Sequence, residues 1–200
     1  MKLHDLMLRQ ATLQAFSRLL QIEFTFYFTG VIHAFFNCSN YTFHENSTEG
    51  RSWVTSRMLC QSSSEGDLVS IEQEEERNFV KDIIKNLTTI KYFIGLKKEN
   101  GKWKWLSNQT TVDSSRGKFP WAEGQPSQPN QGVYCATIYG IYLRHLGRFD
   151  DMSCRRSENV AGYICERAVS CTKDERGRSL FVEDFFLRPG TRILCFFFLS

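Results

Sequence analysis

Cysteine is the residue that most constrains what this chain can fold into. Seven cysteines occur in 200 residues, and no two of them form the C-x-x-C pair typical of zinc ribbons and thioredoxin-like sites. Five N-x-[ST] sequons accompany them and point to the secretory pathway, where cysteines oxidise to disulfides. We therefore expect an extracellular, disulfide-stapled glycoprotein. The predicted glycosylation sites are Asn37, Asn40, Asn46, Asn86 and Asn108.

The charge of the chain argues against a nucleic-acid partner. Its formal net charge is +3, and the Lys and Arg residues are scattered instead of forming a basic stripe. The alternation Lys102-Trp103-Lys104-Trp105 could belong to a sulfated-glycan surface, but period two is also the pattern of a half-buried strand. Because no wider basic field supports the first interpretation, we predict an ordinary strand with two faces.

The N-terminal region carries a separate apolar signal. Residues 24–36 form an apolar run that only His33 interrupts. This run suits the core of a signal peptide or a signal anchor, and it is short for a membrane span of about 20 residues. We expect 1–36 to be an N-terminal extension that leads to secretion or to membrane anchoring through this run. The alternative is a poorly folded extension.

Apolar periodicity predicts two helices early in the folded region. In residues 51–60, Trp53, Val54, Arg57 and Cys60 occur at helical spacing, and a buried tryptophan and cysteine would anchor this helix to a core.

The second predicted helix has a longer pattern. Ser70 and Gln73 fit a capping box, and four glutamates follow in the first turns, where the helix dipole favours negative charge. A single apolar stripe then consists of Phe79, Val80, Ile83, Ile84 and Leu87.

Strands and one long loop make up the rest. Period-two and short apolar segments predict strands at 41–43, 92–96, 102–105, 134–138 and 162–165, and Glu99-Asn100-Gly101 predicts a hairpin turn. Residues 106–134 show little periodicity and hold three of the four prolines, which is typical of a functional or disordered loop. Two helices followed by several strands predict the α+β class.

These segments, in this order, resemble the C-type lectin-like domain over residues 38–167. Phe93-Ile94-Gly95-Leu96 is similar to the family's W-I-G-L strand, with Phe in place of Trp. Further matches are Trp121 before Gly-Gln-Pro, Cys135, the segment 149–154 and Tyr163-Ile164-Cys165-Glu166. The resemblance implies two helices packed on antiparallel sheets with a long loop. It assigns 37–168 to this domain and leaves 169–200 as a C-terminal tail.

The resemblance also implies two disulfides, Cys60–Cys165 and Cys135–Cys154. Cys38, Cys171 and Cys195 are then left over, and an odd number requires a free thiol or a bond between chains. A Cys38–Cys171 bridge is one option. A disulfide-linked dimer through one of these three cysteines is the other.

A calcium-dependent sugar site in this family uses a Glu/Gln-Pro-Asn/Asp triplet with a cis proline, a glutamate before the cysteine, and a Trp-Asn-Asp segment. Here the triplet position holds Gln125-Pro126-Ser127, and Val133 stands at the glutamate position. Phe149-Asp150-Asp151 stands for Trp-Asn-Asp, and Lys98 falls near an acidic ligand of the second calcium position. The only candidate cofactor is therefore Ca²⁺, with Gln125, Asp150 and Asp151 as metal ligands.

A second register, Gln128-Pro129-Asn130, has better donor chemistry but lies only five residues before Cys135. Calcium takes six to eight oxygen ligands, several of them carboxylates, and the carboxylate count here is low. We therefore predict a loop that does not depend strongly on calcium.

The predicted function is an extracellular ligand-binding module for a cell-surface or extracellular protein, or for a glycan. The segment 140–148 is an insertion-like turn with the aromatic and arginine residues favoured at interfaces, although its aromatic residues could also pack inward. The alternative is a calcium-dependent lectin with a weakened, galactose-type site. The candidate ligand-binding residues are Gln125, Ser127, Asn130, Tyr142, Arg144 and Arg148.

An enzyme is the third hypothesis, as a secreted hydrolase, and the sequence disfavours it. The chain contains no G-x-S-x-G, H-E-x-x-H or Walker motif, and two of its four histidines, His4 and His33, lie outside the matching domain. Asp150 and Asp151 are adjacent on a predicted strand, so they would point to opposite faces and could not act as paired catalytic carboxylates.

Overall fold

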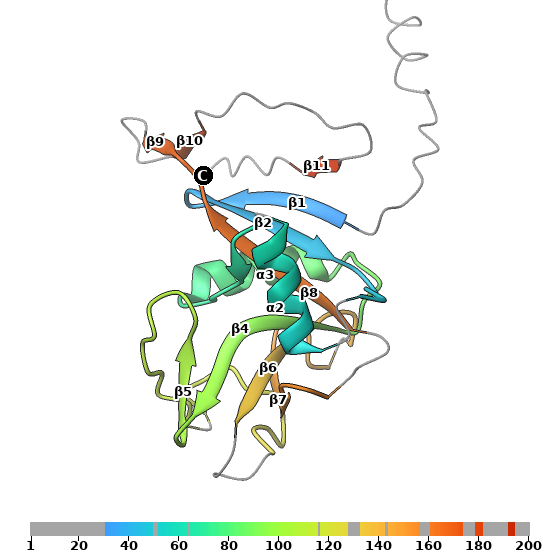
Figure 1. Cartoon of the computed structure of the whole chain (residues 1–200), viewed down its shortest axis with the longest axis vertical. Coiled ribbons are helices and arrows are strands. Elements are labelled where there is room, and N and C mark those ends of the chain that lie inside the picture. The colour runs from blue at the N-terminus through green and yellow to red at the C-terminus, as the bar shows by residue number, and fades with distance from the viewer. Residues whose placement is uncertain are drawn as a thin grey trace, which may run out of the picture.

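The computed structural model describes residues 31–49, 52–63, 65–115, 117–127, 133–142, 144–156, 161–173, 179–181 and 192–194 (Figure 1). Within these ranges, two helices and eleven strands form. In chain order they are β1 (Val31–Phe36), β2 (Ser39–His44), α2 (Trp53–Ser62), β3 (Asp67–Leu68), α3 (Glu74–Ile84), β4 (Lys91–Glu99), β5 (Lys102–Trp105), β6 (Tyr134–Tyr139), β7 (Phe149–Ser153), β8 (Ala161–Ala168), β9 (Cys171–Lys173), β10 (Ser179–Phe181) and β11 (Arg192–Leu194).

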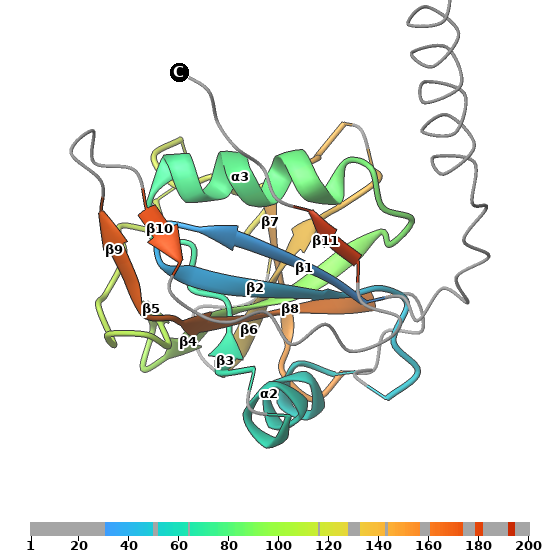
Figure 2. The ribbon, with the colours of Figure 1, turned by 90° about the horizontal axis from the view of Figure 1, so that it is seen from above.

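One large mixed sheet organises the molecule. Its strand order is β11-β1-β2-β8-β4-β6-β7, with β3 paired to β8 and β5 paired to β4. Most neighbours are antiparallel, while β4 runs parallel to β8 and β1 runs parallel to β11. Figure 2 shows α3 on one side of these strands and α2 on the other. The predicted α+β class with two helices and a long loop is confirmed.

The sheet extends beyond both predicted domain boundaries. Strand β1 lies in the segment assigned to the N-terminal extension, and it pairs along its whole length with β2. Strand β11 lies in the segment assigned to the C-terminal tail and pairs with β1. The apolar residues of β1 also fit the end of a signal-peptide core. In the structure they form a strand, in which Ala34 is fully buried. The first part of the apolar run, 24–30, lies outside the described residues.

No helix in the described part of the chain is both long enough and apolar enough to cross a membrane.

Helix α3 packs as predicted but begins differently. Its residues Phe79, Val80, Ile83 and Ile84 are all buried in the main core. The predicted capping box is wrong, because the helix begins at Glu74 and its N-cap Gln73 makes no side-chain cap bond. Ser70 lies too early in the chain to cap the helix, and its hydroxyl accepts a hydrogen bond from the Ser107 amide at 3.2 Å.

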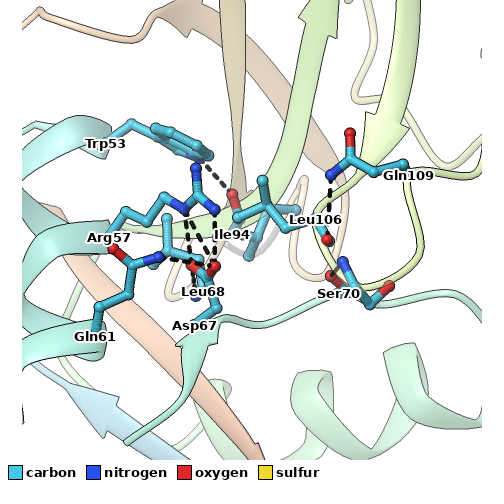
Figure 3. Close-up of polar contacts among 10 residues, drawn as sticks. Trp53, Arg57, Gln61, Asp67, Leu68, Ser70, Ile94, Leu106 and Gln109 are labelled. Atoms are coloured by element: carbon cyan, nitrogen blue, oxygen red, sulfur yellow. Dashed lines mark hydrogen bonds and ion pairs between the residues drawn. The ribbon is translucent and has the colours of Figure 1, made fainter. Parts of the chain in front are cut away.

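Helix α2 is anchored by the two residues that the sequence predicts. Trp53 and Cys60 are buried, while Val54 lies on the outer face. The indole Nε1 of Trp53 donates a hydrogen bond to the Ile94 carbonyl at 2.6 Å, which ties the first turn of α2 to β4 (Figure 3). Ser52 caps the helix by accepting a hydrogen bond from the Thr55 amide.

Three disulfides staple the fold. Cys60–Cys165 joins α2 to β8, and Cys135–Cys154 joins β6 to the residue after β7, so both predicted bridges are confirmed. The third joins Cys38 to Cys171 within the chain. The predicted dimer through Cys38 or Cys171 is therefore wrong, because strands β2 and β8 are paired and bring these two residues to the same end of the sheet. Cys195 lies outside the described residues.

The predicted glycosylation sites differ in exposure. Asn37, Asn46, Asn86 and Asn108 are exposed, and they lie in turns or loops between the elements. Asn40 is half-buried in β2, and its side-chain oxygen is buried without a hydrogen-bond partner among the described residues. Glycosylation of all five asparagines remains a prediction.

A buried acidic residue lies at the base of α3. The Glu76 carboxylate accepts hydrogen bonds from the Tyr41 hydroxyl at 2.8 Å and from the Glu72 amide at 3.1 Å. Burial raises the pKa of Glu76 to about 7, and the nearby charge of Glu166 acts in the same direction. Because this pKa is above that of the unfolded chain, Glu76 favours folding at low pH. That contribution is lost as the pH rises through 7.

Replacement of Glu76 by Gln is therefore expected to change how stability depends on pH. Between pH 4.5 and 7.5 the free energy of unfolding of the wild type should fall, relative to that of the variant, by about 1–3 kcal/mol. Denaturant unfolding at several pH values measures this difference. Glu75→Gln, an exposed neighbour on the same helix, should keep the wild-type dependence. Parallel curves for the wild type and Glu76→Gln would contradict the assignment.

Candidate ligand-binding site

The long loop is anchored close to the point where β7 begins. Trp121 is buried and forms a β-bridge with Phe149. The Ala122 amide donates to the Phe149 carbonyl at 2.8 Å, and the Gln125 amide donates to the Ala122 carbonyl at 3.0 Å. The peptide bond between Gln125 and Pro126 is cis. The loop therefore presents residues 125–127 beside the start of β7.

Of the two aspartates predicted as metal ligands, only Asp151 contacts this loop. Its Oδ1 accepts a hydrogen bond from the Ser127 amide at 2.6 Å. Asp150 points to the other face of β7, where Lys91 Nζ lies 2.6 Å from its carboxylate and the Tyr139 hydroxyl donates to it at 3.3 Å. The structure therefore does not bring Asp150 together with the cis-proline loop.

The remaining predicted donors are sparse. The side-chain oxygen of Gln125 is buried and lacks a hydrogen-bond partner within the described residues, so it remains a competent ligand atom. Val133 is 53% exposed and has no side-chain oxygen to offer. Asn130 lies outside the described residues. Gln125, Ser127 and Asp151 supply one carboxylate between them, which does not fit the six to eight oxygens and several carboxylates that calcium prefers.

Lys98 is the residue predicted from the resemblance to fall near the second calcium position. Lys98 is buried in β4, with its Nζ 6.0 Å from the ring centroid of Trp103 and 5.9 Å from that of Tyr134. Both rings lie within cation–π range of this ammonium group, and its positive charge repels a second cation nearby.

The segment between β6 and β7 builds an aromatic cluster on the surface. The rings of Tyr139, Tyr142 and His145 lie 5.3–5.9 Å apart, with Tyr142 and His145 stacked. Tyr142 is 52% exposed, so this ring does not pack inward. Backbone hydrogen bonds from His145 to Tyr142 and from Gly147 to Tyr139 hold the turn. Gly147 has a φ of +73°, which a residue with a side chain rarely adopts.

An ion pair supports this cluster from below. Lys91 Nζ lies 5.0 Å from the Tyr139 ring centroid and pairs with Asp150, which accepts from the Tyr139 hydroxyl. Burial raises the pKa of Tyr139, and the adjacent Asp150 carboxylate raises it further. The phenol therefore remains protonated and continues to donate to Asp150. This network fixes the base of the turn.

An apolar strip borders the same turn. Ile90, Ile141 and Tyr142 are each more than a third exposed, and Arg144 is exposed beside them. The Gly140 amide donates to the Ile90 carbonyl at 2.7 Å, which places the two chain segments side by side. Tyr142 and Arg144 are among the predicted ligand-binding residues, whereas Ile90 is not, because it precedes β4 and carries no local signal of a surface role. We call Ile90, Ile141, Tyr142 and Arg144 the turn surface.

Arg148 lies at a different place on the turn. It lines a cavity of about 310 Å³ between the beginning of α3 and the long loop, together with Phe119 and Arg77. The structure therefore separates the predicted ligand-binding residues into three places. Gln125 and Ser127 lie at the cis-proline loop, Tyr142 and Arg144 on the turn surface, and Arg148 in this cavity.

Comparison with known proteins agrees with this geometry. A family model described as the lectin C-type domain matches residues 49–167. P-selectin of Mus musculus is 28% identical over 128 residues, which are 63% of this chain and only 16% of that protein. The chain thus corresponds to a small part of this relative.

Solved structures show the same fold. The carbohydrate-recognition domain of the mouse scavenger receptor C-type lectin has a TM-score of 0.52 and 25% identity, covering 68% of this chain and 93% of its own. The Ca²⁺-independent C-type lectin SPL-2 from Saxidomus purpuratus has a TM-score of 0.53 and 24% identity, covering 70% of this chain and 91% of its own.

Proposed function

The chain belongs to the C-type lectin domain family, and on this premise we propose that it is an extracellular binding module for a glycan or a protein with no strong dependence on calcium. One observation carries the proposal. Of the two carboxylates predicted for the calcium site, Asp150 is engaged with Lys91 on the opposite face of β7, and only Asp151 contacts the cis-proline loop. The similar fold of a Ca²⁺-independent lectin supports it.

The contact area that we propose is the turn surface. Its exposed tyrosine and arginine are residue types that dominate binding energy at interfaces, and its two isoleucines add exposed apolar area. The Lys91–Asp150 pair beneath them limits the entropy lost on binding. The relatives described above are binding domains, which supports a binding role and not an enzymatic one.

A calcium-dependent lectin is the second candidate function. The cis Gln125–Pro126 bond and the buried oxygen of Gln125 that lacks a hydrogen-bond partner are the two observations in its favour. Both are features that a calcium site at this loop would use. The observation against a calcium site is that this loop has a single carboxylate, whereas calcium prefers several.

A calorimetric calcium titration of the full chain separates the two functions. We expect no binding heat up to about 10 mM calcium, beyond the weak end of extracellular sites, and the same result for Asp151→Ala. A glycan and extracellular-protein array probed in EDTA should then retain its signals. The double variant Tyr142→Ala/Arg144→Ala should weaken those signals at least about tenfold, while Lys102→Ala, an exposed residue of β5 at the opposite end of β4 from the turn surface, should leave them unchanged.

Two outcomes would contradict the proposal. Millimolar or tighter calcium binding that disappears in Asp151→Ala would establish the metal-dependent lectin. Array signals that survive in EDTA but do not change in the double variant would place the contact area elsewhere on the domain.

A further inference from the structure

A small pocket lies between α2 and the β4–β5 hairpin, at the opposite end of β4 from the turn surface. Lys91 at the start of β4 is paired with Tyr139, whereas Lys98 near its end is paired with Tyr134. The pocket has a volume of about 100 Å³, well below the 300–1,000 Å³ of sites that enclose a whole small molecule. It is therefore sized for a single functional group. It is lined by Arg57, Lys97, Glu99, Lys104, Leu106 and Gln109.

Two lysines of this pocket face each other across the hairpin. Lys97 in β4 is the direct register partner of Lys104 in β5. Like charges at directly opposed positions of an antiparallel pair destabilise the sheet unless a counter-charge is present. Lys97 has one, because its ammonium group pairs with the Glu99 carboxylate. For Lys104, the described residues provide no ion pair and no side-chain hydrogen bond.

Helix α2 adds a third cation that is held rigidly. Arg57 Nε and Nη2 donate to the Asp67 carboxylate at 2.9–3.2 Å, and Gln61 donates to the same carboxylate (Figure 3). The guanidinium carbon also lies 5.7 Å from the Trp53 ring. These contacts use only part of the guanidinium group, and within the described ranges Nη1 has no partner. Arg57 can therefore donate from Nη1 without leaving Asp67.

From this arrangement we propose that the pocket binds one oxyanion, a sulfate or carboxylate group of a ligand, between Arg57 and Lys104. The anion gives Lys104 the direct ion pair that the described residues do not provide, and it accepts hydrogen bonds from a guanidinium group that is already oriented. Glu99 competes for the same cations when no ligand is present. This site is separate from the proposed turn surface and does not depend on it.

The surroundings of Glu99 support such competition. The pKa of its carboxyl is lowered by the hydrogen bond and charge of Lys97, and further by the charges of Lys104 and Arg57. All three cations therefore act on one carboxylate. Because Glu99 is 48% exposed, it can turn towards solvent when another anion enters.

Thermal unfolding of the full chain in sodium sulfate, sodium acetate and sodium chloride at equal ionic strength tests the proposal. Sulfate stabilises folded proteins in general, so the measured quantity is the difference between the wild type and Lys104→Gln. We expect sulfate or acetate to raise the wild-type midpoint by about 2–4 °C more than that of the variant. Comparison of sulfate with acetate distinguishes a sulfate ester from a carboxylate as the ligand group.

Matched variants distinguish anion binding in this pocket from a general effect of net charge. Lys102→Gln removes the same charge from the same face of β5 but lies outside the pocket, so it should respond to sulfate and acetate like the wild type. Glu99→Gln should tighten anion binding at least about threefold by removing the internal competitor. Lys104→Arg should restore binding, which shows that any loss in Lys104→Gln is not a folding defect.

The proposal would be overturned if Lys102→Gln and Lys104→Gln lost the anion response to the same extent, since the effect would then reflect net charge. It would also be overturned if the wild type and Lys104→Gln showed the same shifts in all three salts.

Discussion

In a background where Cys38 and Cys171 are both replaced by Ala, so that no larger loop remains closed around it, removal of the Cys60–Cys165 bridge is expected to lower the free energy of unfolding by about 5 kcal/mol. The estimate follows from the entropy that the bridge removes from an unfolded chain in which the two cysteines are 105 residues apart. A loss of this size is comparable to the whole stability of many domains. The variant with both cysteines replaced by Ala should therefore be largely unfolded at 37 °C.

The shorter bridge provides the matched control. Cys135 and Cys154 are only 19 residues apart, so their replacement by Ala should cost about 3 kcal/mol. Urea unfolding at 25 °C, followed by circular dichroism, measures both values. Equal losses for the two variants would show that native packing around the sulfurs, and not chain entropy, determines the effect.

Replacement of Trp53 by Ala is the second large effect that we expect. Trp53 is only 3% exposed and packs in the core cluster that also contains Cys60, Phe93 and Met152. Truncation leaves a cavity and removes the hydrogen bond to the Ile94 carbonyl, so the free energy of unfolding should fall by about 3–5 kcal/mol.

The conservative variant separates the two contributions at this position. Trp53→Phe keeps most of the buried ring but leaves the Ile94 carbonyl without its donor, which should cost about 1–3 kcal/mol. Urea unfolding of both variants checks this order. If Trp53→Phe were as unstable as Trp53→Ala, the hydrogen bond would outweigh the packing, which contradicts our account of α2.

Local patterns were sufficient to predict the elements that carry a periodic signal. The stripe of α3 and the alternation of β5 appear in the structure because one face of each is buried against the core. The capping box predicted at the start of α3 is wrong, since Ser70 and Gln73 have capping chemistry but Ser70 lies outside the helix. Strand β1 carries no distinct signal in the sequence, because an apolar run has the same composition in a strand and in a signal-peptide core.

The sites were harder to predict because they depend on which face a residue occupies. Strand alternation already implied that Asp150 and Asp151 diverge, but not that Lys91 would pair with Asp150. The Asn100-Gly101 turn, with φ of 51° and 75°, sets the register of the hairpin and so determines that Lys97 faces Lys104. The turn motif in the sequence therefore predicts this pair of lysines. The approach of Arg57 from α2 is tertiary, and no local pattern encodes it.

The Cys38–Cys171 bridge has a mechanical consequence. It joins the turn after β1 to the first residue of β9, 133 residues later in the chain. If the two ends of the polypeptide were pulled apart, this covalent bond would carry the force, and the residues between the two cysteines would not. About 450 Å of contour length, at 3.4 Å per residue, would thus stay sheltered from tension. Under load, the segments outside the bridge would extend while the turn surface and the pocket lined by Arg57 and Lys104 kept their shape.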